Sequence, residues 1–353
     1  EMSSRGLGDV YKRQNKYQRP KNKYQKTKTR DQRPTDNTIM KQITYILITL
    51  SLAFLEISAQ DSIAYSTTDV QIKVDRGFLS GTYLQPNAIA NGAAVLIIAG
   101  SGPTDRDGNN PVMKNNSLKM LAEALASKNI ASLRYDKRGI ANSANAAIPQ
   151  DSLLFEHLIE DAKSAFNHLK SLGHDTIFIA GHSQGSLIGM LVATANHANG
   201  FISIAGPSEP IHQTIMKQME AQPAMIQDTV KAIFSELEAG RKVEEINPML
   251  QSIFHPSIQG FLMSYMKYNP CIEIGKLTAP ILIIQGNTDI QIAEKDAKKL
   301  HENATNSTLK IIDGMNHVLK MADIDRTKNI ATYSQPNLPL ANELMPTIID
   351  FIH

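Results

Sequence analysis

The sequence predicts an α/β protein with a doubly wound, mostly parallel sheet and one inserted helical segment. Three observations lead to this prediction: short apolar runs recur along the chain, helical periods lie between them, and one long interval contains no strand signal. Runs that are apolar at nearly every position are typical of parallel strands buried on both faces. Repeated strand–helix–strand units then imply right-handed crossovers, with helices on both sides of the sheet.

The charge distribution separates the N-terminal residues from the rest of the chain. The 353 residues include 36 Lys and Arg and 34 Asp and Glu, but 12 of the basic and 5 of the acidic residues fall within 1–59. Residues 60–353 therefore carry 24 basic and 29 acidic side chains, which is unlike a nucleic-acid-binding surface. The single cysteine, Cys271, excludes an intramolecular disulfide and any multi-cysteine metal site.

The first 59 residues are predicted to lie outside the folded domain. Residues 1–39 are polar and basic without hydrophobic period, and we interpret them as a non-native or disordered leader. Residues 40–59 resemble a secretory signal peptide, with Lys41 before a mostly apolar stretch and small residues near Gln60. A membrane-spanning helix needs about 20 apolar residues, so a retained anchor is the less favoured alternative. We therefore expect an exported protein, periplasmic or secreted, without stable membrane association after cleavage.

The elements of residues 60–353 follow from their hydrophobic patterns. The runs 70–74 and 79–84 predict an antiparallel pair joined by a short turn that contains Gly77. Buried strands are predicted at 94–99, 130–134, 176–180, 201–205, 281–285 and 309–312. Helices are predicted at 118–126, 153–172, 187–195, 292–300 and 340–352.

One interval departs from this alternation. Residues 207–279 are too many for a single crossover and too apolar for a plain loop. We interpret this interval as a helical cap inserted into an α/β core that residues 60–206 and 280–353 form together.

A possible nucleophile lies where a predicted strand turns into a predicted helix. Residues 181–185 read Gly-His-Ser-Gln-Gly, a G-x-S-x-G motif in the strand–turn–helix context that gives this motif its meaning. Ser183 is therefore the predicted nucleophile, and Gly181 and Gly185 would let neighbouring backbone approach it. His182 is expected to pack or hydrogen-bond locally. A glycine-rich turn that merely opens a helix is the alternative, but it would not require catalytic partners downstream.

Suitable partners do follow, in the order acid and then histidine. Asp289 comes just after the next-to-last predicted strand, and His317 comes just after the last one. An imidazole there can accept the serine proton, and a carboxylate can hold its tautomer. Asp296 and Asp313 are rival acids, but the first falls within a predicted helix and the second adjoins a strand end. A surface histidine is the alternative for His317.

An acyl-transfer enzyme also needs hydrogen-bond donors for the oxyanion. One predicted donor is the N–H of Gln184, directly after the nucleophile at a helix start. The second should come from the glycine-containing loop 100–108, where we favour the N–H of Ser101, followed by that of Gly102. Pro103 is excluded because it has no N–H.

Charged residues in two loops are interpreted as structural. Asp105, Arg106 and Asp107 are expected to pair with one another and order their loop, with substrate contact as the alternative. The run 136–138, which reads Asp-Lys-Arg, is interpreted as scaffolding behind the site.

Taken together, these motifs resemble a known family. The segments that carry the resemblance are 100–108, 134–139, 181–185, 286–289 and 314–317. They are similar to α/β-hydrolases, specifically bacterial esterases and serine-aminopeptidase-like hydrolases with a GSGPxDRDG loop, over residues 65–353. The resemblance implies a Ser-His-Asp triad, no metal or organic cofactor, and hydrolysis of carboxylic esters, often small acyl esters, under a helical cap. Ala99 stands where the wider superfamily commonly has a histidine before the oxyanion glycine.

Several functions share this machinery. A carboxylesterase acting on a small-molecule ester is the first hypothesis, and a thioesterase differs from it only in the leaving group. A serine aminopeptidase would need an acidic group for the substrate amine. Candidates for that group in the insertion are Glu209, Glu220, Glu236, Glu238, Glu244, Glu245 and Glu273. A non-catalytic binding protein on the same fold is the remaining alternative, and it predicts a broken triad.

Overall fold

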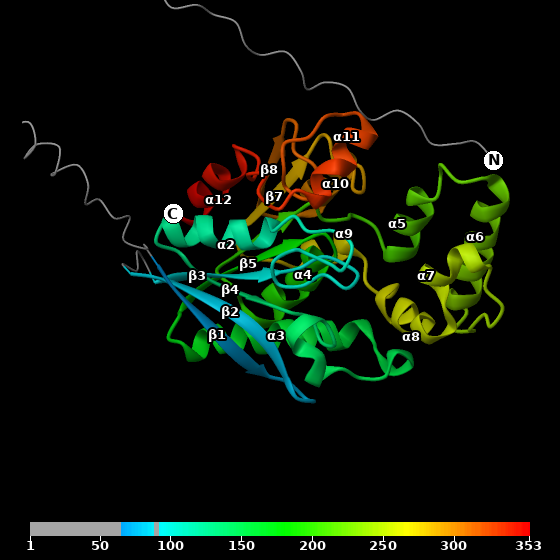
Figure 1. The fold of residues 1–353 in the computed structure, drawn as a ribbon, viewed down its shortest axis with the longest axis horizontal. Coiled ribbons are helices and arrows are strands. Elements are labelled where there is room, and N and C mark those ends of the chain that lie inside the picture. The colour runs from blue at the N-terminus through cyan, green and yellow to red at the C-terminus, as the bar shows by residue number, and fades with distance from the viewer. Residues whose placement is uncertain (1–64, 88–91) are drawn as a thin grey trace, which may run out of the picture. The chain divides into compact units, whose positions relative to one another are not determined.

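The computed structural model describes residues 65–87 and 92–353, and these form one compact unit. The predicted leader and signal peptide lie outside the described residues. The described chain contains one eight-stranded sheet (Figure 1). Its strands are β1 (Tyr65–Lys73), β2 (Phe78–Pro86), β3 (Ala93–Ile98), β4 (Ala131–Tyr135), β5 (Thr176–His182), β6 (Gly200–Ile204), β7 (Ile281–Gly286) and β8 (Ser307–Ile312).

The strand order is β1-β2-β4-β3-β5-β6-β7-β8. β1 pairs with β2, and β2 with β4, in antiparallel fashion, whereas all other pairs from β4 to β8 are parallel. The predicted antiparallel opening pair and the mostly parallel sheet are thus confirmed. Because the remaining strands run in the same direction, the loops after β3, β5, β7 and β8 all emerge at one edge of the sheet.

Helices cover both faces of the sheet, as a doubly wound fold requires. On one face lie α2 (Ser117–Ser127) and α12 (Leu344–Ile352), and on the other lie α3 (Phe155–Ser171), α4 (Gln184–Asn196) and α10 (Glu294–Asn303). In β3, Ala94, Leu96 and Ile98 belong to the core under α3 and α4, while the alternate residues belong to the core under α2 and α12. This alternation on a strand that is buried throughout explains why its sequence is continuously apolar.

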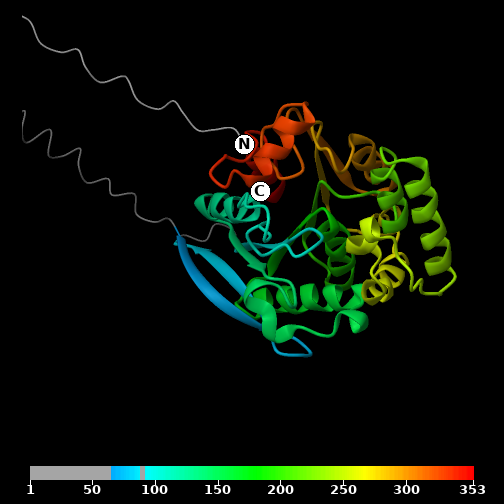
Figure 2. The same ribbon diagram turned by 45° about the vertical axis from the view of Figure 1, so that its right-hand side comes forward.

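Between β6 and β7 the chain forms helices and no strand. These are α5 (Ile211–Gln218), α6 (Ala224–Glu238), η3 (Pro248–Leu250), α7 (Gln251–Phe254), α8 (Pro256–Tyr265) and α9 (Pro270–Ile274). Most of them pack around a small core of their own that includes Phe234, Phe254 and Leu262. Both views show α5 to α8 together at one end of the sheet (Figures 1 and 2).

Some elements differ from the sequence prediction. Hydrophobic periodicity does not reveal four short elements, because each has too few residues. They are the 3₁₀ segments η1 (Ala141–Ala146), η2 (Gln150–Ser152) and η4 (Thr332–Ser334) and the helix α11 (Arg326–Ala331). Helix α10 begins two residues later than predicted, because the N–H groups of Gln291 and Ile292 donate to the Asp289 carboxylate. Among the described residues no helix has the length and apolarity to cross a membrane.

Candidate active site

Ser183 occupies a strained turn between β5 and α4. Its backbone has φ 53° and ψ −121°, a left-handed region that L-residues with side chains rarely adopt. Such a conformation costs about 1–3 kcal/mol and persists only where surrounding structure holds it. Here the Ser183 N–H donates to the carbonyl of Ile204 on β6, and its own carbonyl accepts from Ser186 N–H, both at 2.9 Å. The side chain is half-buried and lines the cavity described below.

The two glycines of the turn leave no room for side chains. A Cβ on Gly181 would lie 2.2 Å from the carbonyl oxygen of Gly185, and a Cβ on Gly185 would lie 2.3 Å from that of Ile98. The turn therefore packs directly on the end of β3. The loop after β3 is equally close, because a Cβ on Gly100 would be 3.2 Å from the Ser183 Cβ.

His317 and Asp289 form a buried pair at the same edge of the sheet. The His317 Nδ1 lies 2.8 Å from Asp289 Oδ2, and the two side chains are 6% and 1% exposed. The carboxylate also accepts hydrogen bonds from Gln285 Nε2 and from the N–H groups of Gln291 and Ile292. Burial would raise the pKa of Asp289, but the interaction with His317 and the backbone donors outweigh it and hold the pKa below its usual value.

The rival acids are engaged elsewhere. Asp296 lies in α10 and accepts from the Ser208 backbone and hydroxyl, and Asp313 accepts from Asn287 Nδ2 at 2.7 Å. The carboxylate that contacts His317 in the structure is therefore that of Asp289, the acid that the sequence analysis favours.

His182 links the serine turn to the histidine loop. Its Nε2–H donates to the main-chain oxygen of His317 at 2.8 Å, and the two imidazole rings are 4.9 Å apart. Burial and the neighbouring His317 lower the pKa of His182 to about 3, so this ring is neutral at pH 7. The residue directly before Ser183 therefore holds the backbone of the loop that carries His317. The local hydrogen-bonding interpretation of His182 agrees with this geometry.

The predicted oxyanion donors lie on two neighbouring segments. Gln184 is the first residue of α4, and Ser101 and Gly102 follow β3. Gln184, Ser101, Gly102 and Ser183 line the same cavity. The Ser101 carbonyl accepts from Thr104 Oγ1 at 2.7 Å, and the buried ammonium of Lys137 donates to two other carbonyls of this loop.

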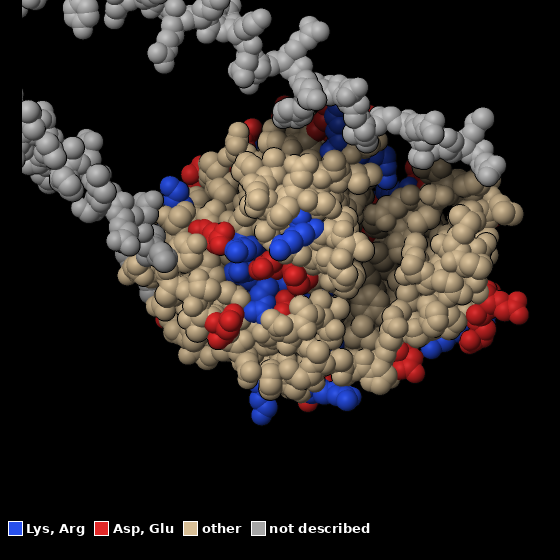
Figure 3. Space-filling view, in the orientation of Figure 1, with Lys and Arg blue, Asp and Glu red and all other residues tan. Residues whose placement is uncertain are grey.

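A cavity of about 610 Å³ opens over Ser183. The insertion supplies an apolar wall made of Ile211, Ile215, Met219, Ile253, Phe261 and Leu262. Figure 3 shows the surface hollowed between the main body and the helices of the insertion, with mostly uncharged walls. Among the described residues, Lys137 and Arg138 are the charged ones that line the cavity, and no described Asp or Glu lines it.

Comparisons with known proteins agree with the fold. Residues 114–252 match the family described as Hydrolase_4, serine aminopeptidase, S33. The esterase EstD of Thermotoga maritima is 28% identical over 246 residues, which are 68% of this chain and 58% of that protein. The match thus spans less than two thirds of that relative's length.

Two solved structures show the same architecture. Est1E from Butyrivibrio proteoclasticus, solved with ferulic acid, has a TM-score of 0.52 at 16% identity, covering 80% of this chain and 99% of that one. Proline iminopeptidase from Mycobacterium smegmatis has a TM-score of 0.52 at 15% identity, covering 81% and 98%. The chain has the α/β-hydrolase fold. At such identities the structural likeness establishes the fold and not the substrate.

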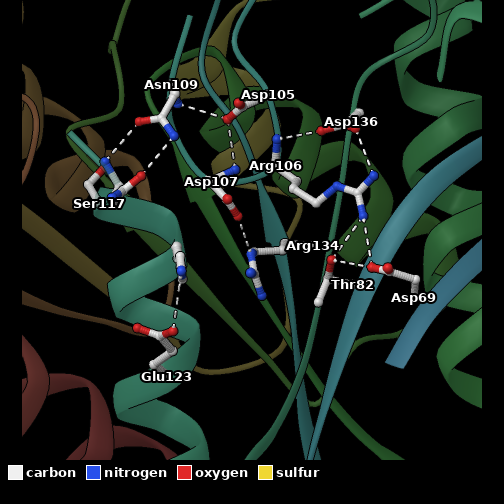
Figure 4. Close-up of polar contacts among 12 residues, drawn as sticks. Asp69, Thr82, Asp105, Arg106, Asp107, Asn109, Ser117, Glu123, Arg134 and Asp136 are labelled. Carbon is white, nitrogen blue, oxygen red and sulfur yellow. Dashed lines mark hydrogen bonds and ion pairs between the residues drawn. The ribbon is translucent and has the colours of Figure 1, made fainter. Parts of the chain in front are cut away.

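The loop of residues 100–108 is ordered by charged contacts to its neighbours (Figure 4). Arg106 pairs with Asp136 at 2.8 Å, and Asp107 pairs with Arg134 at 2.9 Å. Asp105 instead accepts from backbone N–H groups within the loop. The sequence-based expectation that these three residues pair with one another is wrong, because Arg106 and Asp107 find partners on or just after β4 and Asp105 binds loop backbone.

Three residues of the candidate site carry no local sequence signal. Gln285 bonds to Asp289 from within β7, and Tyr265 of α8 shares a hydrogen bond with the Gln184 side chain. Lys137 belongs to a run that the sequence predicts to lie behind the site, yet it lines the cavity. Long-range packing sets all three positions, so spacing along the chain does not reveal them. No group of three His, Cys, Asp or Glu residues in the described chain is arranged to hold a metal ion.

Proposed function

We propose that this protein is a serine hydrolase that cleaves carboxylic esters through an acyl-enzyme. The observation that carries the proposal is the juxtaposition of a strained, cavity-facing Ser183 with a buried His317–Asp289 pair. Ser183 is the nucleophile, His317 the general base, and Asp289 the group that fixes the imidazole tautomer. EstD, an esterase by name, supports the ester-cleaving class.

The contacts define how the proposed reaction would proceed. His317 Nδ1–H donates to Asp289, which leaves Nε2 unprotonated and able to take the Ser183 proton. Ser183 Oγ attacks the ester carbonyl carbon, and the resulting oxyanion is bound by the N–H groups of Gln184 and Ser101, or Gly102. The alcohol leaves with the proton from His317. Water then attacks the acyl-enzyme by the same route and releases the carboxylic acid.

The described lining of the cavity gives no support to the aminopeptidase alternative, which requires an acidic group. Binding a substrate α-ammonium in the cavity calls for a carboxylate, but its charged lining residues, Lys137 and Arg138, are both basic. The glutamates of the insertion are engaged or exposed. Glu209, Glu236, Glu238 and Glu273 lie within 4.0 Å of a Lys, Arg or His, and Glu220, Glu244 and Glu245 are exposed.

The apolar wall favours a neutral acyl group. We propose that the helices within 207–279 act as a cap over this group, and that small acyl esters are the substrates. A thioester has the same acyl carbonyl and remains a second possible substrate. The proposal includes export of the chain after removal of the signal peptide 40–59 by cleavage near Gln60, and it involves no nucleic-acid partner.

A parallel rate screen tests this function. The chain and its Ser183→Ala variant are compared on p-nitrophenyl esters of increasing acyl length and on aminoacyl and prolyl p-nitroanilides. We expect ester turnover that the variant lacks, and labelling of Ser183 by a fluorophosphonate probe. Faster anilide than ester hydrolysis would make the protein a peptidase. Absence of both labelling and turnover would favour a non-catalytic binding protein.

A further inference from the structure

Lys137 is a buried cation without an acidic partner. It follows β4, it is 7% exposed, and no ion pair involves it in residues 65–87 and 92–353. Its sequence neighbours differ, because Asp136 pairs with Arg106 and Arg138 pairs with Asp161. A buried, unpaired ammonium is costly unless its protons are hydrogen-bonded.

The protons of Lys137 go to the loop beside the nucleophile. Nζ donates to the carbonyl oxygen of Gly100 at 2.6 Å and to that of Gly102 at 2.5 Å. These carbonyls flank Ser101, whose N–H is the favoured oxyanion donor. Burial lowers the pKa of Lys137 to about 7, and the neutral amine keeps two N–H groups for the same two acceptors.

Peptide geometry connects Lys137 to one donor in particular. The Gly100 carbonyl and the Ser101 N–H belong to the same peptide unit, and the described chain has no cis bond. In a planar trans peptide these two groups point in opposite directions, so fixing the carbonyl also fixes the N–H. We propose that Lys137 is a positioning residue that aims the Ser101 N–H at the oxyanion. This inference rests on the proposed ester hydrolysis.

The second carbonyl bound by Lys137 controls no donor. The Gly102 carbonyl shares its peptide unit with Pro103, which has no N–H. The competing donor, Gly102 N–H, shares its peptide with the Ser101 carbonyl, which Thr104 Oγ1 binds at 2.7 Å. Lys137 therefore orients the peptide that carries the Ser101 N–H, and Thr104 orients the peptide that carries the Gly102 N–H. A substitution of Thr104 is thus a matched control for a substitution of Lys137.

The test compares the full-length chain with Lys137→Met and Thr104→Val. Each protein is assayed for kcat and KM on p-nitrophenyl butyrate and for inhibition by a trifluoromethyl ketone, whose adduct on Ser183 carries an oxyanion. Removing one oxyanion donor lowers kcat by about 10²–10³. We expect Lys137→Met to lower kcat about 10²-fold and weaken the inhibitor similarly, with KM within about threefold. Thr104→Val should change kcat less than about fivefold.

Each result separates this inference from the proposed function. Wild-type chain that neither hydrolyses esters nor reacts with a fluorophosphonate would overturn both. An active wild type with Lys137→Met of similar kcat, or with a changed KM alone, would overturn the role of Lys137. A large loss in Thr104→Val alone would assign the donor to Gly102 instead. If Lys137→Met does not fold, as judged by thermal unfolding, Lys137→Leu takes its place, and a kcat within about threefold of wild type would refute the role.

Discussion

Replacing Asp289 by asparagine should remove most of the catalytic rate while leaving the fold in place. In the structure Oδ1 accepts from the N–H groups of Gln291 and Ile292, and Oδ2 accepts from His317 Nδ1 and Gln285 Nε2. An asparagine that keeps its oxygen toward the two backbone N–H groups must turn its NH₂ toward His317 and Gln285. That NH₂ is a donor, so His317 Nδ1 has to become an acceptor and Nε2 has to carry the proton.

A protonated Nε2 cannot take the proton of Ser183. We therefore expect kcat to fall by a factor of about 10³–10⁴, which corresponds to about 4–5.5 kcal/mol in the activation barrier. The alternative amide rotamer would place the NH₂ against the two backbone N–H donors, so it is also unfavourable. Stability should fall by about 1–3 kcal/mol, because the Gln285 amide also faces a donor.

The assay measures kcat on a p-nitrophenyl ester together with thermal unfolding. Asp313→Asn is the matched control, because Asp313 also lies just after a strand of this edge but bonds to Asn287. It should change kcat less than about threefold. Near-normal turnover in Asp289→Asn, or a larger loss in Asp313→Asn, would refute the assignment of the acid and the reasoning from hydrogen-bond direction.

Four further substitutions and one change of pH test the site and its energetics. Ser183→Ala and His317→Ala should each abolish nearly all ester turnover with little change in melting temperature. Ser183→Gly should be inactive yet more stable by about 1 kcal/mol, because glycine adopts the positive φ without strain. An unchanged melting temperature in Ser183→Gly would argue against backbone strain at this position. Gly185→Ala should destabilise by more than about 2 kcal/mol in urea unfolding, because its Cβ would lie 2.3 Å from a main-chain oxygen of β3, and a wild-type midpoint would contradict that packing. Burial lowers the pKa of Lys137 to about 7 and that of Lys320 to about 8, so above pH 7 the unfolded chain binds more protons than the folded chain. The urea concentration at the unfolding midpoint should therefore be higher at pH 9 than at pH 7. A lower midpoint at pH 9 would refute this direction of pH dependence.

Much of the fold could be predicted because its signals are local. The interior strands are continuously apolar, since helices cover both of their faces, and the runs at 94–99 and 281–285 mark β3 and β7 almost to the residue. The serine turn was equally visible, because only glycine fits at positions 181 and 185. The order of serine, acid and histidine along the chain then limited the candidate catalytic partners of Ser183 to residues in a few loops after later strands.

Contacts between distant segments could not be predicted in the same way. Asp105, Arg106 and Asp107 are adjacent in sequence, so mutual pairing was the simplest expectation, yet Arg106 and Asp107 each pair with a residue on or just after β4. Short helices such as α11 carry too few residues to show a period. The pairing of Asp289 rather than Asp313 with His317 depends on side-chain direction, which strand-end position does not determine.

Two locally unfavourable features line the cavity of the proposed site. Ser183 has a strained backbone, and Lys137 is a buried cation that lacks an acid. Each is held by main-chain groups from a different strand or loop: Ile204 binds the Ser183 N–H, and the loop after β3 accepts from Lys137. The sheet core therefore supplies the stability that holds both groups in place. On this reasoning, substitutions that relax either feature should separate stability from activity, the first rising or staying constant while the second falls.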